Sequence, residues 1–262
     1  MADETYLFID GAYLRDKHSK ALRRVFTQVP EISLLQLKGQ AIAKRVFFYD
    51  CLHDIKDEVE TEEAFQERLK KDEAYFSAIR ALPGFHVRWG TLTGRRGRLR
   101  QKEVDVQLAV DMLTHGFSKN MSKAVLLSGD LDFRPIVEAL IRAGVFVEIW
   151  YEKESAAKEL FWAADYGREL TFQDFYSMSD EKFTQENPLP RKVVGREPEL
   201  MLARPLKSGQ ANGRPVHVFK TGLLYRLLYS AGWHDSIVLE LDKQDTLERY
   251  FSEFYAPIEW DK

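Results

Sequence analysis

The chain has 262 residues, a formal net charge of −3 and one cysteine, and 45% of its residues are hydrophobic. This length allows one large domain or a domain with an appendage, and the hydrophobic content is sufficient for a buried core. The near-neutral charge excludes a globally basic nucleic-acid-binding protein, so any nucleic-acid surface must be local. A single cysteine excludes an intramolecular disulfide and a cysteine zinc site, which favours a reducing cytoplasm. We expect no signal peptide and no membrane span, because no basic segment with an apolar core and no long apolar run occurs.

The first predicted strand ends in an acid. Residues 6–9 form a short apolar run, and Asp10-Gly11 follows it directly. This position lies at the carboxyl edge of an α/β sheet, where ligands bind, although an Asp in a turn is also common without any function. Residues 14–26 have helical spacing, Pro30 interrupts them, and a helix is expected over residues 33–40.

Two further strands are expected at residues 44–50 and 85–90, with a long charged helix between them at residues 58–82. Asp50 also ends a strand, but Cys51-Leu52-His53 after it matches no phosphate-binding loop and no metal motif. We therefore interpret Asp50 as peripheral.

A glycine-interrupted basic loop over residues 93–102 leads into the next predicted helix. It contains five cations and no acid: Arg95, Arg96, Arg98, Arg100 and Lys102. The helix covers residues 103–113, with Asp105 in its first turn and Asp111 nearly two turns further on. Asp105 is the better ligand candidate because it can face the edge of the sheet, whereas Asp111 is expected to bridge, cap or orient.

Two acids follow the fourth predicted strand, at residues 124–127. The segment after it reads Ser128-Gly129-Asp130-Leu131-Asp132. Two carboxylates this close repel each other unless a cation lies between them, and hard divalent cations prefer such oxygen ligands. An Asp between a strand and a helix is also an ordinary helix cap, and Asp132, just before the helix expected over residues 133–142, is equally well explained in this way. The hypothesis of a site therefore depends on partners elsewhere, namely Asp10 and Asp105.

A strand at residues 145–150, a helix at 155–164 and a last short strand at 170–172 are expected next. The alternation predicts an α/β domain over residues 1–175, with a mostly parallel sheet covered by helices. Residues 187–215 hold five of the nine prolines, so we interpret residues 176–215 as a linker or arm. Residues 216–262 are expected to form a small helical or α+β region that packs on the main domain, on itself in a homo-oligomer, or on a protein partner.

Three segments in this order resemble the NYN domain family (LabA-like, PIN-like ribonucleases) over residues 5–172. They are Asp10-Gly11, Lys102-Glu103-Val104-Asp105 and Ser128-Gly129-Asp130-Leu131-Asp132-Phe133. The sequence departs from the family pattern at two positions. Tyr13 stands where an Asp-Gly-x-Asn turn has Asn, and Leu131 stands where the family has Ser. Neither change removes a carboxylate, so both concern substrate positioning more than metal binding.

The resemblance implies a Rossmann-like, PIN-like fold whose acids bind Mg²⁺ or Mn²⁺ and hydrolyse RNA phosphodiester bonds. Carried over by motif, the catalytic and metal-binding residues are Asp10, Asp105, Asp130 and Asp132, with Asp111 as a secondary residue. The residues expected to bind RNA are Lys102, Ser128, Arg95, Arg96, Arg98, Arg100 and Tyr13.

Three other functions are alternatives to a ribonuclease. A non-catalytic RNA-binding or regulatory module with the same fold is the main alternative, because of the two departures. A nucleotide-sugar-binding Asp-x-Asp motif gives no role to Asp10 or to the basic loop. A haloacid-dehalogenase-type phosphatase needs a second Asp where Ala12 stands.

Overall fold

The computed structural model describes residues 4–51, 61–90, 104–194, 200, 202–230 and 236–261. The chain divides into two compact units. The first comprises Met1–His18 and Ile32–Met178, and the second comprises Ser19–Glu31 and Ser179–Lys262. Within the described ranges, no helix is both long and apolar enough to cross a membrane.

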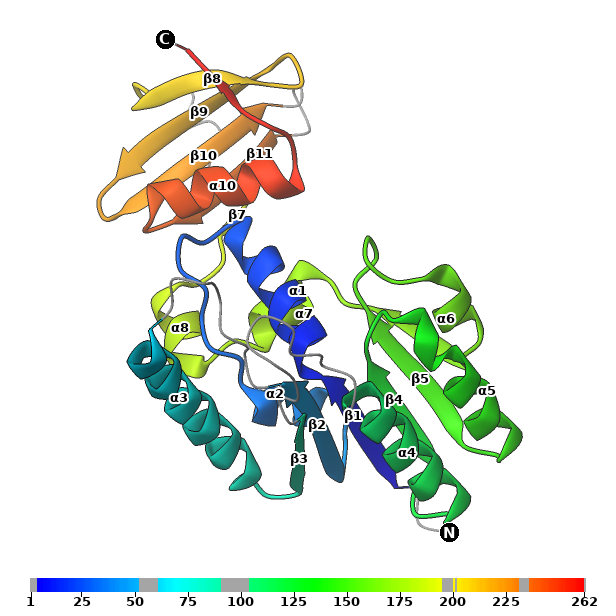
Figure 1. Ribbon diagram of the computed structural model, residues 1–262. Coiled ribbons are helices and arrows are strands. Elements are labelled where there is room, and N and C mark those ends of the chain that lie inside the picture. Colours follow the sequence, from blue (N-terminus) through cyan, green and yellow to red (C-terminus); the bar gives the residue numbers. More distant parts are fainter. Residues whose placement is uncertain are drawn as a thin grey trace. The chain divides into compact units, whose positions relative to one another are not determined.

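The first unit is built on a six-stranded sheet in the order β3-β2-β1-β4-β5-β6 (Figure 1). Every neighbouring pair is parallel. The strands are β1 (Thr5–Asp10), β2 (Arg45–Cys51), β3 (Phe85–Gly90), β4 (Lys123–Leu127), β5 (Phe146–Tyr151) and β6 (Tyr166–Glu169). This arrangement confirms the predicted α/β, PIN-like class.

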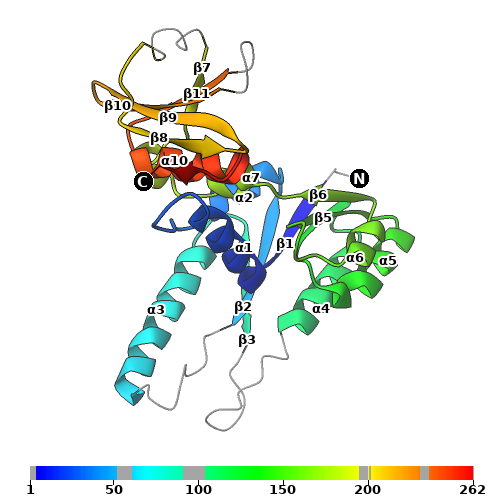
Figure 2. The ribbon, with the colours of Figure 1, turned by 90° about the horizontal axis from the view of Figure 1, so that it is seen from above.

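Helices cover both faces of this sheet, as Figures 1 and 2 show. On one face, α4, α5 and α6 pack on alternate strand residues such as Phe8, Leu126 and Ile149, because successive strand side chains point to opposite faces. The other face carries α1, α2, α3 and α7. The helices are α1 (Gly11–Arg23), α2 (Leu34–Gln40), α3 (Glu62–Arg80), α4 (Val104–Phe117), the 3₁₀ turn η1 (Leu131–Phe133), α5 (Arg134–Arg142), α6 (Lys158–Trp162) and α7 (Phe172–Ser177).

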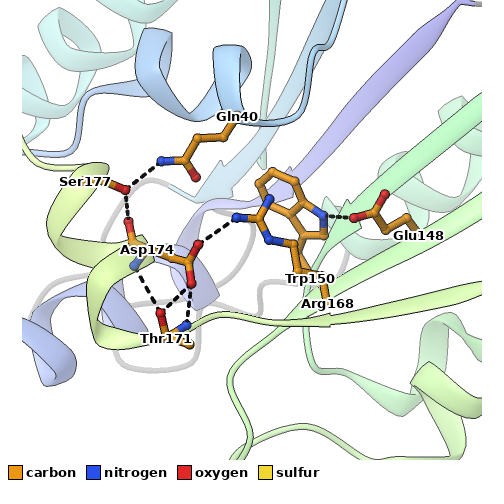
Figure 3. A network of polar contacts seen from close by, with 7 residues as sticks. All are labelled: Gln40, Glu148, Trp150, Arg168, Thr171, Asp174 and Ser177. Carbon is orange, nitrogen blue, oxygen red and sulfur yellow. Dashed lines mark hydrogen bonds and ion pairs between the residues drawn. The ribbon is translucent and has the colours of Figure 1, made fainter. Parts of the chain in front are cut away.

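The end of the first unit differs from the sequence prediction. The short strand expected at residues 170–172 is wrong, because β6 ends at Glu169 and α7 begins at Phe172. Thr171 and Asp174 form a reciprocal capping box that starts this helix. Arg168 then binds the Asp174 carboxylate at 2.6 Å and lies over the ring of Trp150, 4.3 Å from its centroid (Figure 3).

The second unit is an antiparallel sheet in the order β12-β8-β9-β10-β11-β7, with helix α10 packed on one face. Its elements are α8 (Glu181–Glu186), β7 (Arg191–Val193), β8 (Lys207–Ala211), β9 (Arg214–Thr221), β10 (Leu224–Ser230), β11 (Ser236–Leu241), α10 (Gln244–Phe254) and β12 (Glu259–Trp260). Part of the expected linker over residues 176–215 is therefore ordered structure. In this part, β7 pairs with β11 and β8 pairs with β9.

Candidate active site

The carboxyl ends of β1 and β4 lie side by side at the centre of the first sheet. The chain builds the sheet outward from β1 through β2 to β3, and then returns to place β4 on the other side of β1. Such a reversal opens a crevice outside the carboxyl ends of the two strands, which is where open α/β sheets bind ligands. Ile9 and Leu127 are register partners, so Asp10 and Ser128 are the next residues on each strand.

Ser128 connects the two strand ends. Its side chain is fully buried, and its hydroxyl donates to Asp10 Oδ2 at 3.4 Å. The same hydroxyl oxygen accepts from the backbone amide of Asp130 at 3.3 Å. One buried hydroxyl therefore fixes the position of the Asp10 carboxylate relative to the backbone of Asp130.

Asp10 is also the residue that starts helix α1. Its Oδ1 accepts from the backbone amide of Tyr13 at 3.0 Å. Burial raises the pKa of Asp10 above its usual range, and the charge of Asp130 raises it further, against the lowering effect of these hydrogen bonds. The ionised carboxylate is thus held in a place where its charge is only partly compensated.

Asp130 and Asp132 form the exposed part of the site. Asp130 Oδ1 accepts from the backbone amide of Asp132 at 3.0 Å and so caps η1. The other carboxylate oxygen of Asp130, Oδ2, takes no part in this capping hydrogen bond. Asp130, Leu131 and Asp132 are all exposed to solvent. The capping role that the sequence suggested for Asp132 belongs to Asp130.

Asp105 is near the same acids, in the first turn of α4. Its pKa is raised by partial burial and by the charges of Asp10, Asp130 and Asp132. Asp105 is exposed to solvent, as are Asp130 and Asp132. The other three predicted carboxylates therefore all act on Asp105, although the four come from three different elements and one turn.

All four groups offer hard carboxylate oxygens, which suits Mg²⁺ or Mn²⁺, and a cation would relieve their mutual repulsion. In the described part of the chain, no three His, Cys, Asp or Glu side chains are placed to hold one ion. The acids thus fit a divalent cation in chemistry and charge. Ligation of one ion by three of them would require side-chain rearrangement.

Asp111 is engaged elsewhere on α4. Its Oδ2 accepts from the Tyr49 hydroxyl at 2.8 Å and from Arg88 Nε at 3.2 Å. Burial and the charge of Asp111 raise the pKa of Tyr49. Asp111 therefore links α4 to β2 and β3. Of the three roles expected for it from the sequence, which were to bridge, cap or orient, this is the bridging role.

Tyr13 is hydrogen-bonded to the loop that follows β5. Its hydroxyl accepts from the backbone amide of Glu152 at 2.9 Å and is hydrogen-bonded to Ser155 Oγ at 3.1 Å. Its ring lies against Gly129, where an added Cβ would be 2.8 Å from Tyr13 Cε2. These contacts occupy the polar group of Tyr13.

Sequence reasoning missed one ion pair next to these acids. Arg15, in α1, donates from Nη2 to Asp50 Oδ1 at 2.8 Å, and its Nη1 is paired with Asp50 Oδ2. The Asp50 side chain is only 1% exposed, whereas that of Arg15 is 33% exposed. The sequence contained one signal that could have indicated this pair, namely a cation near the start of the helix that follows Asp10-Gly11.

The predicted RNA contacts Arg95, Arg96, Arg98, Arg100 and Lys102 lie outside the described residues.

The parallel sheet and its central reversal define a PIN-like α/β fold. The sequence model described as the NYN domain matches residues 4–170. The chain therefore belongs to the NYN domain family.

Among solved structures, the chain is similar to a protein of unknown function, VPA0982, from Vibrio parahaemolyticus RIMD 2210633. The identity is 17%, the TM-score is 0.47, and the match covers 64% of this chain and 93% of that one. No curated protein matches the chain.

Proposed function

We propose that this protein is a metal-dependent ribonuclease that hydrolyses RNA phosphodiester bonds at the acids outside β1 and β4. The observation that carries the proposal is the placing of these acids at one edge of the sheet, where burial, and then the charges of neighbouring acids, raise the pKa of Asp10 and Asp105. A protein keeps such an uncompensated acidic cluster at a cost in stability, and a cation bound in function offsets that cost. Membership of a nuclease-like family supports the same conclusion.

In this proposal, Asp10, Asp105, Asp130 and Asp132 hold Mg²⁺ or Mn²⁺. When bound, the ion supplies Lewis-acid stabilisation and a water of lowered pKa. Ser128 and the Tyr13 amide keep Asp10 fixed through the hydrogen bonds described above. One carboxylate of the cluster accepts the proton of the attacking water, and the exposed position of Asp130 and Asp132 gives an RNA strand access to the site.

The test is cleavage of a panel of single-stranded, hairpin and transfer RNAs in Mg²⁺, in Mn²⁺ and in EDTA. Asp130→Asn removes the charge but keeps an oxygen that can cap η1. Asp180→Asn is the matched control, because Asp180 caps α8 in the second unit by accepting from the Phe183 amide at 2.8 Å. We expect metal-dependent cleavage in the wild type and in the control, and a loss of at least about 100-fold in Asp130→Asn.

A competing proposal is an RNA-binding module without catalysis. It is favoured by one observation, which is that no three metal-binding side chains in the described residues are placed around a common ion. RNA binding that needs no metal, without cleavage under any condition, would support this alternative and contradict the nuclease. Cleavage that persists in Asp130→Asn would contradict the acidic mechanism.

A further inference from the structure

The pair of Arg15 and Asp50 lies directly beside the acidic site. Asp10 is the register partner of Tyr49, so Asp50 is the first residue past that pairing on the neighbouring strand. An added Cβ on Gly11 would be 2.5 Å from Asp50 Oδ2, which shows how closely the Asp50 carboxylate approaches the residue after Asp10. Asp50, together with Phe48, thus leaves no room for a side chain at position 11.

Cys51, the last residue of β2, also indicates that Arg15 lies close to the acids. After burial, the groups that act on the pKa of its thiol include Asp105, Arg15 and Asp10. The guanidinium group and two of the four acids therefore lie around one side chain at the carboxyl edge of the sheet.

The guanidinium group of Arg15 has donors left after binding Asp50. An arginine has five N–H donors in a planar fork, and the two contacts to Asp50 use two of them. The remaining donors belong to a group that is one-third exposed, and the buried Asp50 fixes its orientation. A fixed, partly exposed guanidinium is suited to bind a phosphate oxygen, which arginine does with strong, charge-assisted hydrogen bonds.

We propose that Arg15, oriented by Asp50, forms a subsite for a backbone phosphate of the RNA next to the bond that is cleaved. This inference rests on the proposed function, because the subsite serves an RNA strand that lies across the acids. Arg15 is then a substrate-binding residue, and Asp50 is the positioning residue that holds it. Arg15 belongs to the folded domain, so its positive charge lies beside the acids independently of the basic loop over residues 93–102.

A purely structural role for Arg15 must be separated from this one. Asp50 is buried, so removing Arg15 alone would leave an uncompensated buried charge and destabilise the domain. The double variant Arg15→Gln/Asp50→Asn removes both charges and keeps hydrogen-bonding groups at both positions. The matched control is Arg168→Gln/Asp174→Asn, which removes the ion pair between β6 and α7 (Figure 3).

The measurement is the affinity for a single-stranded RNA oligonucleotide in EDTA as a function of salt, together with KM and kcat for cleavage in Mn²⁺. We expect Arg15→Gln/Asp50→Asn to bind RNA about tenfold more weakly, as the loss of one charge-assisted contact implies. The salt dependence should be shallower by about 0.7 in the slope of log K against log salt, the value for one phosphate on a single strand. The control pair should leave both quantities unchanged.

If the double variant fails to fold, Arg15→Lys provides the second test. Lysine keeps a positive charge for Asp50 but loses the fork, so KM should rise while the melting temperature stays close to that of the wild type. A wild type that cleaves RNA, with unchanged affinity, salt slope and KM in the folded variants, would overturn the subsite and leave the proposed function intact. If the wild type binds RNA but never cleaves it, and the variants bind RNA more weakly, the subsite is supported and the nuclease is refuted. A wild type that binds no RNA would overturn both.

Discussion

The buried hydroxyl of Ser128 donates to the carboxylate of Asp10 across the ends of β1 and β4, at 3.4 Å. It also accepts from the Asp130 amide, so it connects two of the four acids without being an acid itself. Loss of a group that orients a metal ligand in this way typically lowers the affinity for the metal by about 10- to 100-fold.

Ser128→Ala should therefore weaken metal binding while all four carboxylates remain. We expect a loss of about 10- to 100-fold in the affinity for Mn²⁺, measured from the metal dependence of RNA cleavage. The free energy of unfolding should fall by about 1–3 kcal/mol, because a buried amide and a carboxylate oxygen lose a partner. Ser177→Ala is the control, since the Ser177 hydroxyl is hydrogen-bonded to Gln40 and to the backbone carbonyl of Asp174 (Figure 3). Equal metal affinity in both variants would show that Ser128 does not orient the site.

Asp10→Asn should make the metal-free protein more stable. Burial and Asp130 raise the pKa of Asp10, so the ionised group destabilises the folded state. Asparagine keeps the oxygen that accepts from the Tyr13 amide, and it removes the charge. We expect a melting temperature in EDTA that is higher by a few degrees, together with loss of the stabilisation by Mn²⁺. A lower melting temperature in EDTA would show that the charge is well compensated in the native protein.

The pH dependence of cleavage provides a separate test of the raised pKa values of Asp10 and Asp105. Protons compete with the metal for these carboxylates, so activity should fall as the pH decreases toward their raised pKa values, above the ordinary range of an aspartic acid. A higher concentration of Mn²⁺ should shift this acidic limb to lower pH. The measurement is the initial rate against pH at two Mn²⁺ concentrations, and an acidic limb that does not move would show that it does not report metal ligands.

Gly129 should tolerate no side chain while Tyr13 is present. An added Cβ would be 2.8 Å from Tyr13 Cε2 and 3.1 Å from the Ser155 carbonyl oxygen. Gly129→Ala should lower the free energy of unfolding by about 1–3 kcal/mol, the usual cost of overpacking. In a Tyr13→Ala background the same change should cost less, because the ring is gone, and denaturant unfolding of the four proteins measures this coupling. Additive effects would mean that the Ser155 backbone, and not the Tyr13 ring, limits the space.

The position of the acids at the ends of strands could be predicted because the signal is local. Asp10 and Asp130 each follow a short apolar strand directly, and the carboxyl ends of parallel strands lie at one edge. The pair of Arg15 and Asp50 could not be predicted in the same way. Its residues are 35 positions apart, and they meet only because β2 is the neighbour of β1 in a particular register.

The second unit was harder to predict because its strands β7 and β8 lie in a proline-containing stretch. β7 has only three residues, and it joins the sheet through pairing with β11. A strand this short has no recognisable alternation of polar and apolar residues. Its pairing is reinforced by a charge contact, from Arg191 to the carboxylate of Glu240 on β11.

Glu240 should therefore control how firmly β7 is held. Its side chain is 5% exposed, and it accepts from Arg226 Nε at 2.9 Å in addition to Arg191. The hydrogen bond from Arg191, followed by that from Arg226, lowers the pKa of Glu240 despite its burial. A carboxyl group with a lowered pKa stabilises the folded state above its unfolded pKa, and this contribution disappears as the pH falls through the folded value.

Glu240→Gln should reduce the stability of the second unit by about 1–3 kcal/mol at neutral pH, because two arginines lose a charged acceptor. Hydrogen exchange at residues 191–193 should become faster, since β7 depends on this contact. Glu248→Gln is the control, because Glu248 pairs with Lys207 on β8 at 2.8 Å, whereas β7 pairs with β11. The difference between Glu240→Gln and the wild type should vanish in acid, where Glu240 is protonated in both states of the wild type. Unchanged exchange in β7 would mean that its backbone pairing with β11 alone is sufficient.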